Sequence, residues 1–173
     1  MIGAIRPAFG MIRRILLTLQ AADIWSHRRR VRMIRAAGME LGPDVVIKPG
    51  TFIGGGRLRI GRAAYVNREC LLEAAGGLTI GERTGIGPRV TILTISHELM
   101  DDYPRHGPTR IEPVTIGGNV WIGAAVTILP GTRIGDGCVV AAGSLVRGVL
   151  APDGLYAGVP ARRIRELPSR RGM

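Results

Sequence analysis

Aliphatic residues recur at every sixth position from Leu41 onward, a period that matches neither an α-helix nor an ordinary β-strand. Four runs keep this phase, and their members are Leu41, Ile47 and Ile53; Ile60, Val66 and Leu72; Ile80, Ile86 and Ile92; and Ile116, Ile122, Ile128, Ile134, Val140 and Val146. A hexad with one inward aliphatic residue is typical of a parallel β-helix, in which each hexad is a short strand plus a corner. Three hexads complete one triangular turn, so the repeat predicts an all-β fold of about five coils.

Glycine follows many of the inward residues, as in Ile60-Gly61 and Ile80-Gly81. We expect these glycines to adopt a turn conformation with positive φ, which a Cβ disfavours. Aromatic residues make up only 4% of the chain, so the core is expected to consist of stacked Ile, Val and Leu layers. The glycines have no G-X-Y period, which excludes a collagen helix.

Breaks in the hexad phase indicate where the coil is interrupted. Two extra residues enter between Leu72 and Ile80, around an Ala-Ala-Gly-Gly stretch. Residues 97–113 are polar, contain proline and do not fit the repeat. We expect them to form a loop extruded from the coil, and long loops on rigid scaffolds are where function concentrates.

Residues 1–38 are expected to form a basic helical arm, distinct from a β-helix domain with a basic C-terminal tail over residues 39–173. The arm contains eight arginines and one acid, Asp23. A second short helix is expected to end at Gly38. The apolar residues with helical spacing in the first helix are Ile12, Ile15, Leu16 and Leu19. Two compatible interpretations follow: the apolar side caps the end of the core, or the helix lies on an anionic membrane surface.

The formal net charge of +11 comes almost entirely from arginine, a residue that suits phosphate recognition. Anionic lipid and a phosphorylated cofactor are therefore candidate partners. Nucleic acid is not expected as a partner, because the chain has no zinc-finger spacing, recognition-helix pattern or aromatic-interleaved basic strand. No metal is expected either, since no Cys/His cluster has the spacing of metal ligands.

The two cysteines, Cys70 and Cys138, are too few for a disulfide framework and are expected to be reduced and packed. Reduced cysteines are consistent with a cytoplasmic location. The sequence predicts neither a transmembrane helix nor a signal peptide. The basic arm leaves peripheral contact with the inner face of the membrane open.

Several segments resemble the hexapeptide-repeat acyltransferases, in particular the maltose and galactoside O-acetyltransferases and their polysaccharide-modifying relatives. These segments are Ser96-His97-Glu98, Trp121-Ile122-Gly123, Ile128-Leu129-Pro130-Gly131, Ala142-Gly143-Ser144 and Ala157-Gly158-Val159-Pro160-Ala161-Arg162. The resemblance covers about residues 41–167. It implies a left-handed β-helix, a homotrimer, and acetyl-CoA as co-substrate in a cleft between neighbouring subunits. None of these three properties follows from the periodicity.

The resemblance also places His97 at the family's catalytic histidine, so His97 is expected to act as a general base. A neutral imidazole can take the proton of a sugar hydroxyl as the oxygen attacks the thioester, and return it to the departing CoA thiolate. The cysteines lie within the coils rather than beside His97, so direct transfer without a covalent intermediate is expected. His27 in the arm and His106 in the loop receive no catalytic role.

Two residues match acceptor-binding positions of the family, Asn67 and Glu73. Alternatively, Asn67 is a corner residue in a left-handed turn and Glu73 is a solvated loop charge. The placement of Glu73 matches the polysaccharide-modifying relatives better than the maltose and galactoside enzymes. It therefore favours a saccharide acceptor from glycan assembly, such as a polysaccharide or a lipid-linked intermediate.

The resemblance assigns a further set of residues to acetyl-CoA: Trp121, Ala124, Ala142, Arg147, Arg162 and Arg165. The arginines would bind phosphates, Trp121 would pack on the pantetheine arm, and the backbone N–H of Ala124 would stabilise the oxyanion. Two other functions stay open: N-acetylation of an amino sugar or an aminated antibiotic, and a non-catalytic β-helix scaffold.

Overall fold

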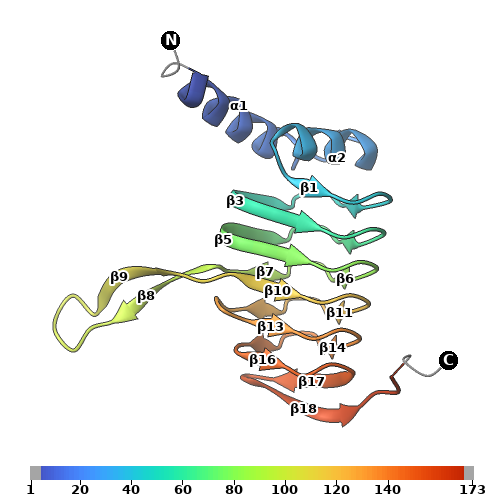
Figure 1. Ribbon diagram of the computed structural model, residues 1–173, viewed down its shortest axis with the longest axis vertical. Coiled ribbons are helices and arrows are strands. Elements are labelled where there is room, and N and C mark those ends of the chain that lie inside the picture. The colour runs from blue at the N-terminus through green and yellow to red at the C-terminus, as the bar shows by residue number, and fades with distance from the viewer. Residues whose placement is uncertain (1–4, 170–173) are drawn as a thin grey trace.

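Three ladders of short strands stack along one axis and form a triangular prism (Figure 1). The computed structural model describes residues 5–169; the first four residues of the predicted arm and the last four of the predicted basic tail lie outside the described residues. Helices α1 (Ile5–Leu19) and α2 (His27–Ala36) cover one end of the prism, and β18 (Ala161–Glu166) lies at the other end.

The strands lie on three faces. Face 1 holds β1 (Glu40–Leu41), the second halves of β3 (Phe52–Ile60) and β5 (Leu71–Ile80), β10 (Val114–Ile116), β13 (Arg133–Ile134) and β16 (Val149–Leu150). Face 2 holds β2 (Val46–Ile47), β4 (Tyr65–Val66), β6 (Gly85–Ile86), β11 (Trp121–Ile122), β14 (Val139–Val140), β17 (Gly154–Gly158) and the antiparallel β18. Face 3 holds the first halves of β3 and β5, then β7 (Thr91–Ile92), β12 (Thr127–Ile128) and β15 (Leu145–Val146).

Each face ends in a corner where turns from successive coils lie one above another. We name the corners after the face that they follow. The first corner contains the turns at 61–63, 81–83, 117–119, 135–137 and 151–153; the second contains those at 67–69, 87–89, 123–125 and 141–143; and the third contains 73–77, 93–95, 129–131 and 147–148. Residues far apart in the sequence are thus neighbours along a corner.

The strand register confirms that three hexads make one turn of a parallel β-helix. Ile60 pairs with Ile80, Ile80 with Ile116, and Ile116 with Ile134, so inward residues one turn apart lie directly above each other. All four side chains are buried. Burying an aliphatic side chain of this size contributes roughly 1.5–3 kcal/mol, so the stacked columns supply the core.

Within the described residues, the parallel strands of face 2 stack in six levels, one more than the predicted coils. Leu150 pairs with Ile134, and Tyr156 pairs with Val140, which extends both inward columns. The hexad repeat conceals this last turn because Leu150 follows Val146 by four positions instead of six.

The glycines that follow inward residues do not have the conformation that the sequence predicts. Positive φ occurs two positions later, at Ala63 (φ 54°) and Arg83 (φ 53°), and not at Gly61 or Gly81. A Cβ on Gly61 would instead lie 2.5 Å from the backbone nitrogen of Glu82 in the next coil. The prediction of a positive-φ glycine is therefore wrong at these positions: glycine is required because successive coils approach closely.

The predicted extruded loop is confirmed, and most of it is an ordered ribbon. Strands β8 (Ile95–Leu99) and β9 (His106–Ile111) form an antiparallel hairpin that projects sideways from the prism (Figure 1). The hairpin leaves the third corner directly after β7 and returns to face 1 at β10.

The two predicted arm helices are present, but α1 packs through a different side from the predicted one. Leu17 and Gln20 are buried against the solenoid, and the Gln20 Nε2 donates to the Thr51 carbonyl at 2.8 Å. Of the predicted apolar stripe only Leu16 packs partly on the core. The other three members are exposed: Ile12, Ile15 and Leu19. The expectation that the stripe covers the core is thus wrong for these three residues. Neither described helix is long and apolar enough to cross a bilayer.

Arg30 shows that not every arginine of the arm is a surface charge. Its guanidinium is buried and donates to three backbone carbonyls, those of Gln20 at 2.7 Å, Ile47 at 3.2 Å and Ala22 at 2.8 Å. These hydrogen bonds join α2, the turn between the helices and the first coil. The arm is therefore fixed to the prism by polar contacts as well as by apolar ones.

Replacing Gly61 with Ala should destabilise the protein by about 1–3 kcal/mol, because the added Cβ overlaps the backbone of the next coil. Gly85→Ala is the matched control, since a Cβ there has no atom within 4 Å and should change stability by no more than about 0.5 kcal/mol. Urea unfolding of both variants measures the difference. Equal stability of the two variants would contradict the close-approach explanation.

Candidate active site

His97 lies on β8 near the base of the projecting hairpin, and its side chain is exposed. Its Nδ1 is 3.0 Å from the carbonyl oxygen of Gly107 on the opposite strand. A carbonyl oxygen can only accept, so this contact places the ring proton on Nδ1 and leaves the Nε2 lone pair available. The ring also makes an edge contact with His106, with centroids 5.8 Å apart. The structure thus holds His97 in the tautomer that a general base requires.

Glu73 anchors the segment that leads into this hairpin. Its Oε2 accepts hydrogen bonds from the backbone N–H groups of Thr94 at 2.8 Å and Ile95 at 2.9 Å. Glu73 is half-buried at the third corner, one coil away from these two residues. The side chain is therefore part of the site's framework rather than a solvated charge.

A hollow of about 520 Å³ lies beside the hairpin base along the third corner. Its lining includes Ser96, which precedes His97, together with Arg147 and Arg162. Arg110 also lines it, but Arg110 is paired with Glu112 at 2.7 Å. Within the described part of the chain, Arg147 and Arg162 have no carboxylate partner. The hollow therefore offers two uncompensated guanidinium groups, which suit a phosphorylated ligand.

The remaining predicted residues lie on a different corner. Asn67, Ala124 and Ala142 belong to turns of the second corner, where the Gly143 N–H donates to the Ala124 carbonyl at 2.9 Å. The Asn67 Oδ1 accepts from the backbone N–H of Arg68 at 2.8 Å, but Asn67 does not have the positive φ of the left-handed turn considered for it. This second group is separated from His97 by face 3, so one chain does not bring the two groups together.

Trp121 and Arg165 lie apart from both groups. Trp121 points outward from face 2 and is 63% exposed, beside Gly85 on the neighbouring strand. A Cβ on Gly85 would contact nothing within 4 Å, so the surface beside the indole is open. Arg165 is exposed on β18 opposite Leu155 and does not line the hollow that contains Arg162.

The backbone N–H of Ala124 donates to no group within residues 5–169. Pro49 and Pro88 occupy the equivalent corner position in earlier coils, so the fold itself does not require an N–H there. A free N–H on a rigid corner can serve as a hydrogen-bond donor to a developing oxyanion.

Both cysteines are free and buried, as the sequence predicts. Burial raises the pKa of the Cys70 thiol to about 11, and it also raises the pKa of Cys138. A thiol with a pKa this high is almost entirely protonated at neutral pH and is a poor nucleophile. The cysteines therefore do not provide a covalent route for acyl transfer.

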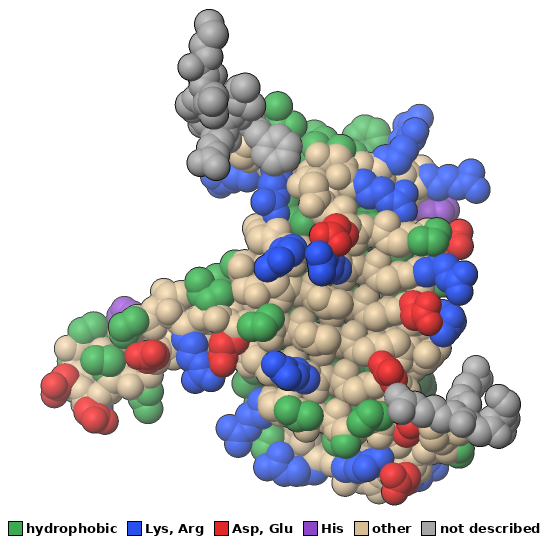
Figure 2. Space-filling view, in the orientation of Figure 1, with side chains coloured by type: hydrophobic (Ala, Val, Ile, Leu, Met, Phe, Trp, Pro, Cys, Tyr) green, Lys and Arg blue, Asp and Glu red, His purple; other side chains and the backbone are tan. Residues whose placement is uncertain are grey.

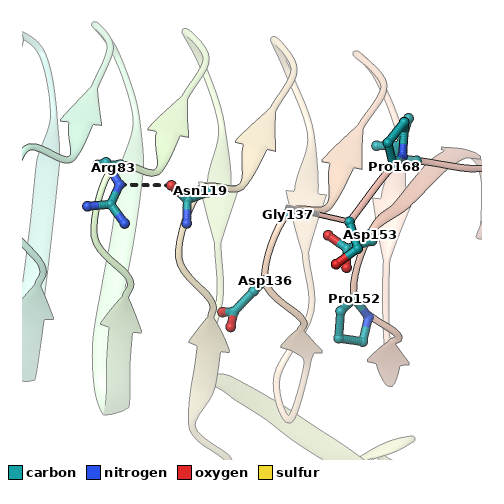
Figure 3. Close-up of a pocket in the computed structure, with 9 residues that line it drawn as sticks. Arg83, Asn119, Asp136, Gly137, Pro152, Asp153 and Pro168 are labelled. Atoms are coloured by element: carbon teal, nitrogen blue, oxygen red, sulfur yellow. Dashed lines mark hydrogen bonds between the residues drawn. The ribbon is translucent and has the colours of Figure 1, made fainter. Parts of the chain in front are cut away.

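A second hollow, of about 500 Å³, lies on the first corner and carries no predicted residue (Figure 3). Two of its charged groups have partners: the Arg83 Nε donates to Asn119 Oδ1 at 2.9 Å, and Asp136 Oδ1 accepts from the Gly118 N–H at 2.8 Å. The described residues that line it include neither an imidazole nor a thiol. This hollow therefore contains none of the residues that the sequence assigns to the site.

Several contacts of the site could not be read from the sequence. The Gly107 carbonyl orients His97, yet a backbone acceptor leaves no side-chain signal. The pairing of Arg110 with Glu112 depends on the hairpin register. From the sequence alone, residues 97–113 are one polar loop. The strand pairing in the structure shows which of these residues face each other.

Comparisons with known proteins agree with the fold and the motifs. Residues 113–148 match the family model for the bacterial transferase hexapeptide, six repeats. The galactoside O-acetyltransferase of Escherichia coli strain K12 is 35% identical over 143 residues, which cover 82% of this chain and 70% of that protein. The galactoside O-acetyltransferase of Lactococcus lactis is 32% identical over 156 residues, with coverage of 88% and 75%.

Solved structures of acetyltransferases superpose over nearly the whole chain. A hexapeptide-repeat acetyltransferase from Vibrio cholerae, complexed with acetyl-coenzyme A, has a TM-score of 0.84 and 31% identity, covering 97% of this chain and 92% of its own. A galactoside acetyltransferase in complex with coenzyme A has a TM-score of 0.84 and 31% identity, with coverage of 95% and 83%. These likenesses confirm the left-handed parallel β-helix, whose hand the periodicity does not reveal. By fold, repeat and sequence, the chain belongs to the hexapeptide-repeat acetyltransferase family, as a relative of the galactoside O-acetyltransferases.

Proposed function

We propose that this acetyltransferase moves an acetyl group from acetyl-CoA directly to a hydroxyl of a saccharide, with His97 as the general base. The observation that carries the proposal is the hydrogen bond from His97 Nδ1 to the Gly107 carbonyl, which leaves Nε2 free to accept a proton. The galactoside acetyltransferase relatives support the hydroxyl acceptor and the CoA thioester.

In this mechanism the acceptor oxygen attacks the thioester carbonyl while its proton passes to His97 Nε2. The tetrahedral intermediate then collapses, the C–S bond breaks, and the proton passes from His97 to the CoA thiolate. The backbone N–H of Ala124 donates to the oxyanion in the intermediate. The buried, protonated cysteines are consistent with direct transfer.

The substrate contacts follow the same assignment. Asn67 and Glu73 contact the saccharide, and Glu73 also keeps the hairpin in place through Thr94 and Ile95. For acetyl-CoA, Arg147, Arg162 and Arg165 bind the phosphates. The pantetheine arm of acetyl-CoA packs against Trp121 and the corner at Ala142. The free guanidinium groups in the hollow beside Ser96 support the phosphate assignment. The acceptor is a saccharide of glycan assembly, either polymeric or linked to lipid.

We further propose that the working unit is a homotrimer. His97 and the Ala124 corner lie on opposite sides of face 3 in one chain. A neighbouring prism would supply the missing corner, so that each site combines the hairpin of one subunit with the second corner of another. This arrangement explains why single-chain geometry divides the predicted residues into two groups.

His97→Ala should lower acceptor-dependent CoA release by roughly 10²–10⁴-fold, the usual contribution of general acid–base catalysis. His106→Ala is the comparison variant, and we expect a smaller loss because this ring makes only an edge contact with His97. A thiol-detection assay with acetyl-CoA and a panel of saccharides measures both. Equal release by the wild type and His97→Ala would refute the base assignment.

The same panel separates the other functions that the sequence leaves open. Matched hydroxyl and amine sugars in competition distinguish O-transfer from N-transfer. If no acceptor turns over, CoA binding is measured by calorimetry. Absence of both turnover and binding would favour a non-catalytic scaffold and would refute the proposed function.

Ala124→Pro should lower kcat by about 10²–10³-fold, because it removes one oxyanion donor and leaves acetyl-CoA binding intact. The fold should tolerate proline, since Pro88 fills the same corner position one coil earlier. Arg62→Pro is the matched control. On the first corner, Pro43 fills the position of Arg62 one coil earlier, just as Pro88 fills the position of Ala124 on the second corner. Thermal unfolding of both variants checks the fold, and an unchanged kcat for Ala124→Pro would contradict the donor assignment.

Subunits carrying His97→Ala and subunits carrying Ala142→Trp should each be inactive alone but active when they are assembled together. In every mixed trimer one of the three sites would combine an intact hairpin with an intact corner, because only one neighbouring pair has the two variants in the right order. Co-expression with two affinity tags isolates the mixed species. Absence of any recovered activity would show that the site is not shared between subunits.

A further inference from the structure

Helix α1 carries an apolar stripe that points away from the prism. Its members, with their exposed fractions, are Met11 (63%), Ile12 (55%), Ile15 (51%) and Leu19 (48%). Ile24, in the turn that follows, is 80% exposed. We call these five residues the outer stripe. A contiguous apolar surface of this kind on a described helix indicates a contact that the isolated chain does not make.

The helix cannot rotate to bury the outer stripe without losing its present contacts. Leu17 packs in the core, and Gln20 donates to the carbonyls of Leu17 at 3.0 Å and Thr51 at 2.8 Å. The Gly50 N–H donates to the Ala21 carbonyl at 2.8 Å just after the helix. The orientation of α1 is therefore fixed by the solenoid, and the stripe remains on the outside.

Arginine side chains flank the stripe at the same end of the prism. Arg14 lies on α1, and Arg28, Arg29 and Arg32 lie on α2; all four are exposed. Within residues 10–38 the one acid is Asp23, and none of the four arginines forms an ion pair with a described carboxylate. Figure 2 shows blue Lys and Arg side chains and green apolar surface at the helical end of the molecule.

We propose that this end of the molecule binds the surface of an anionic lipid bilayer. The outer stripe enters the boundary between headgroups and acyl chains, and the arginines of α1 and α2 contact the lipid phosphates. An apolar helical face bordered by arginine is the pattern of interfacial helices. Neither described helix can span a bilayer, so the contact is peripheral.

A second copy of the chain is a less suitable occupant for the stripe. Two stripes face to face would bring two copies of the same cluster, Arg14, Arg28, Arg29 and Arg32, close together. Like charges at such a contact repel, whereas phosphate headgroups neutralise them. Charge complementarity therefore favours lipid.

The experiment is sedimentation of the full chain with vesicles of phosphatidylcholine alone and of phosphatidylcholine mixed with phosphatidylglycerol. Wild-type protein should bind the mixed vesicles and should be released as salt is added. Ile15→Asp should weaken binding about tenfold or more, because it loses apolar burial and adds a negative charge. Ile164→Asp is the matched control, since Ile164 is 61% exposed on β18 at the opposite end, and it should bind like the wild type.

A triple variant, Arg28→Gln, Arg29→Gln and Arg32→Gln, tests the charge contribution. We expect at least tenfold weaker binding to the mixed vesicles and a smaller dependence on salt. Equal binding to both vesicle types, or wild-type binding by Ile15→Asp, would overturn the proposal. Light scattering without lipid adds a further test: if Ile15→Asp lowers the molar mass and the wild type binds neither vesicle, the stripe joins copies of the chain and the lipid proposal is wrong.

Discussion

Contact between the backbones of successive coils is the constraint on which the rest of this structure depends. Each coil forms backbone hydrogen bonds with the coils on either side, and the corners come so close that Gly61 has no room for a Cβ. The stacked aliphatic columns fill the interior, but the corner geometry sets the spacing of the coils. A scaffold built this way is stiff, because moving one corner requires moving its neighbours as well.

In the proposed mechanism, this stiffness would keep the reacting groups in place. The third corner holds the base of the His97 hairpin through Glu73, while the second corner presents the N–H of Ala124. Acyl transfer needs a base and an oxyanion donor at fixed separation, and neither group can supply that separation by itself. In the proposed homotrimer, this separation is fixed because the third corner of one subunit lies beside the second corner of another.

The sequence predicts the repeating part of the molecule well and its exceptions poorly. The hexads identify the inward residues, the three-hexad turn and the place where the loop leaves the coil, since these depend on a period that survives in the sequence. The sixth level is missed because Leu150 follows Val146 out of phase. Helix α1 is predicted as a helix, but the choice of its buried side depends on the hydrogen bond between Gln20 and Thr51. Hydrophobic periodicity considers only apolar residues and therefore gives no weight to this polar contact. The family motif makes His97 a candidate, whereas its hydrogen-bond partner, the Gly107 carbonyl, has no signature in the sequence.

The antiparallel return of β18 has a consequence for the lifetime of the protein in solution. A parallel β-helix ends in open strand edges, and such edges can recruit further chains end to end, as in fibrils. At one end, α2 covers the first coil and Arg30 fixes it there. At the other end, β18 runs against β17 in the reverse direction and carries the charged side chains Arg162, Arg163, Arg165 and Glu166. On face 2 the last edge of the prism is therefore a reversed and charged strand, which disfavours pairing with the parallel edge of another chain.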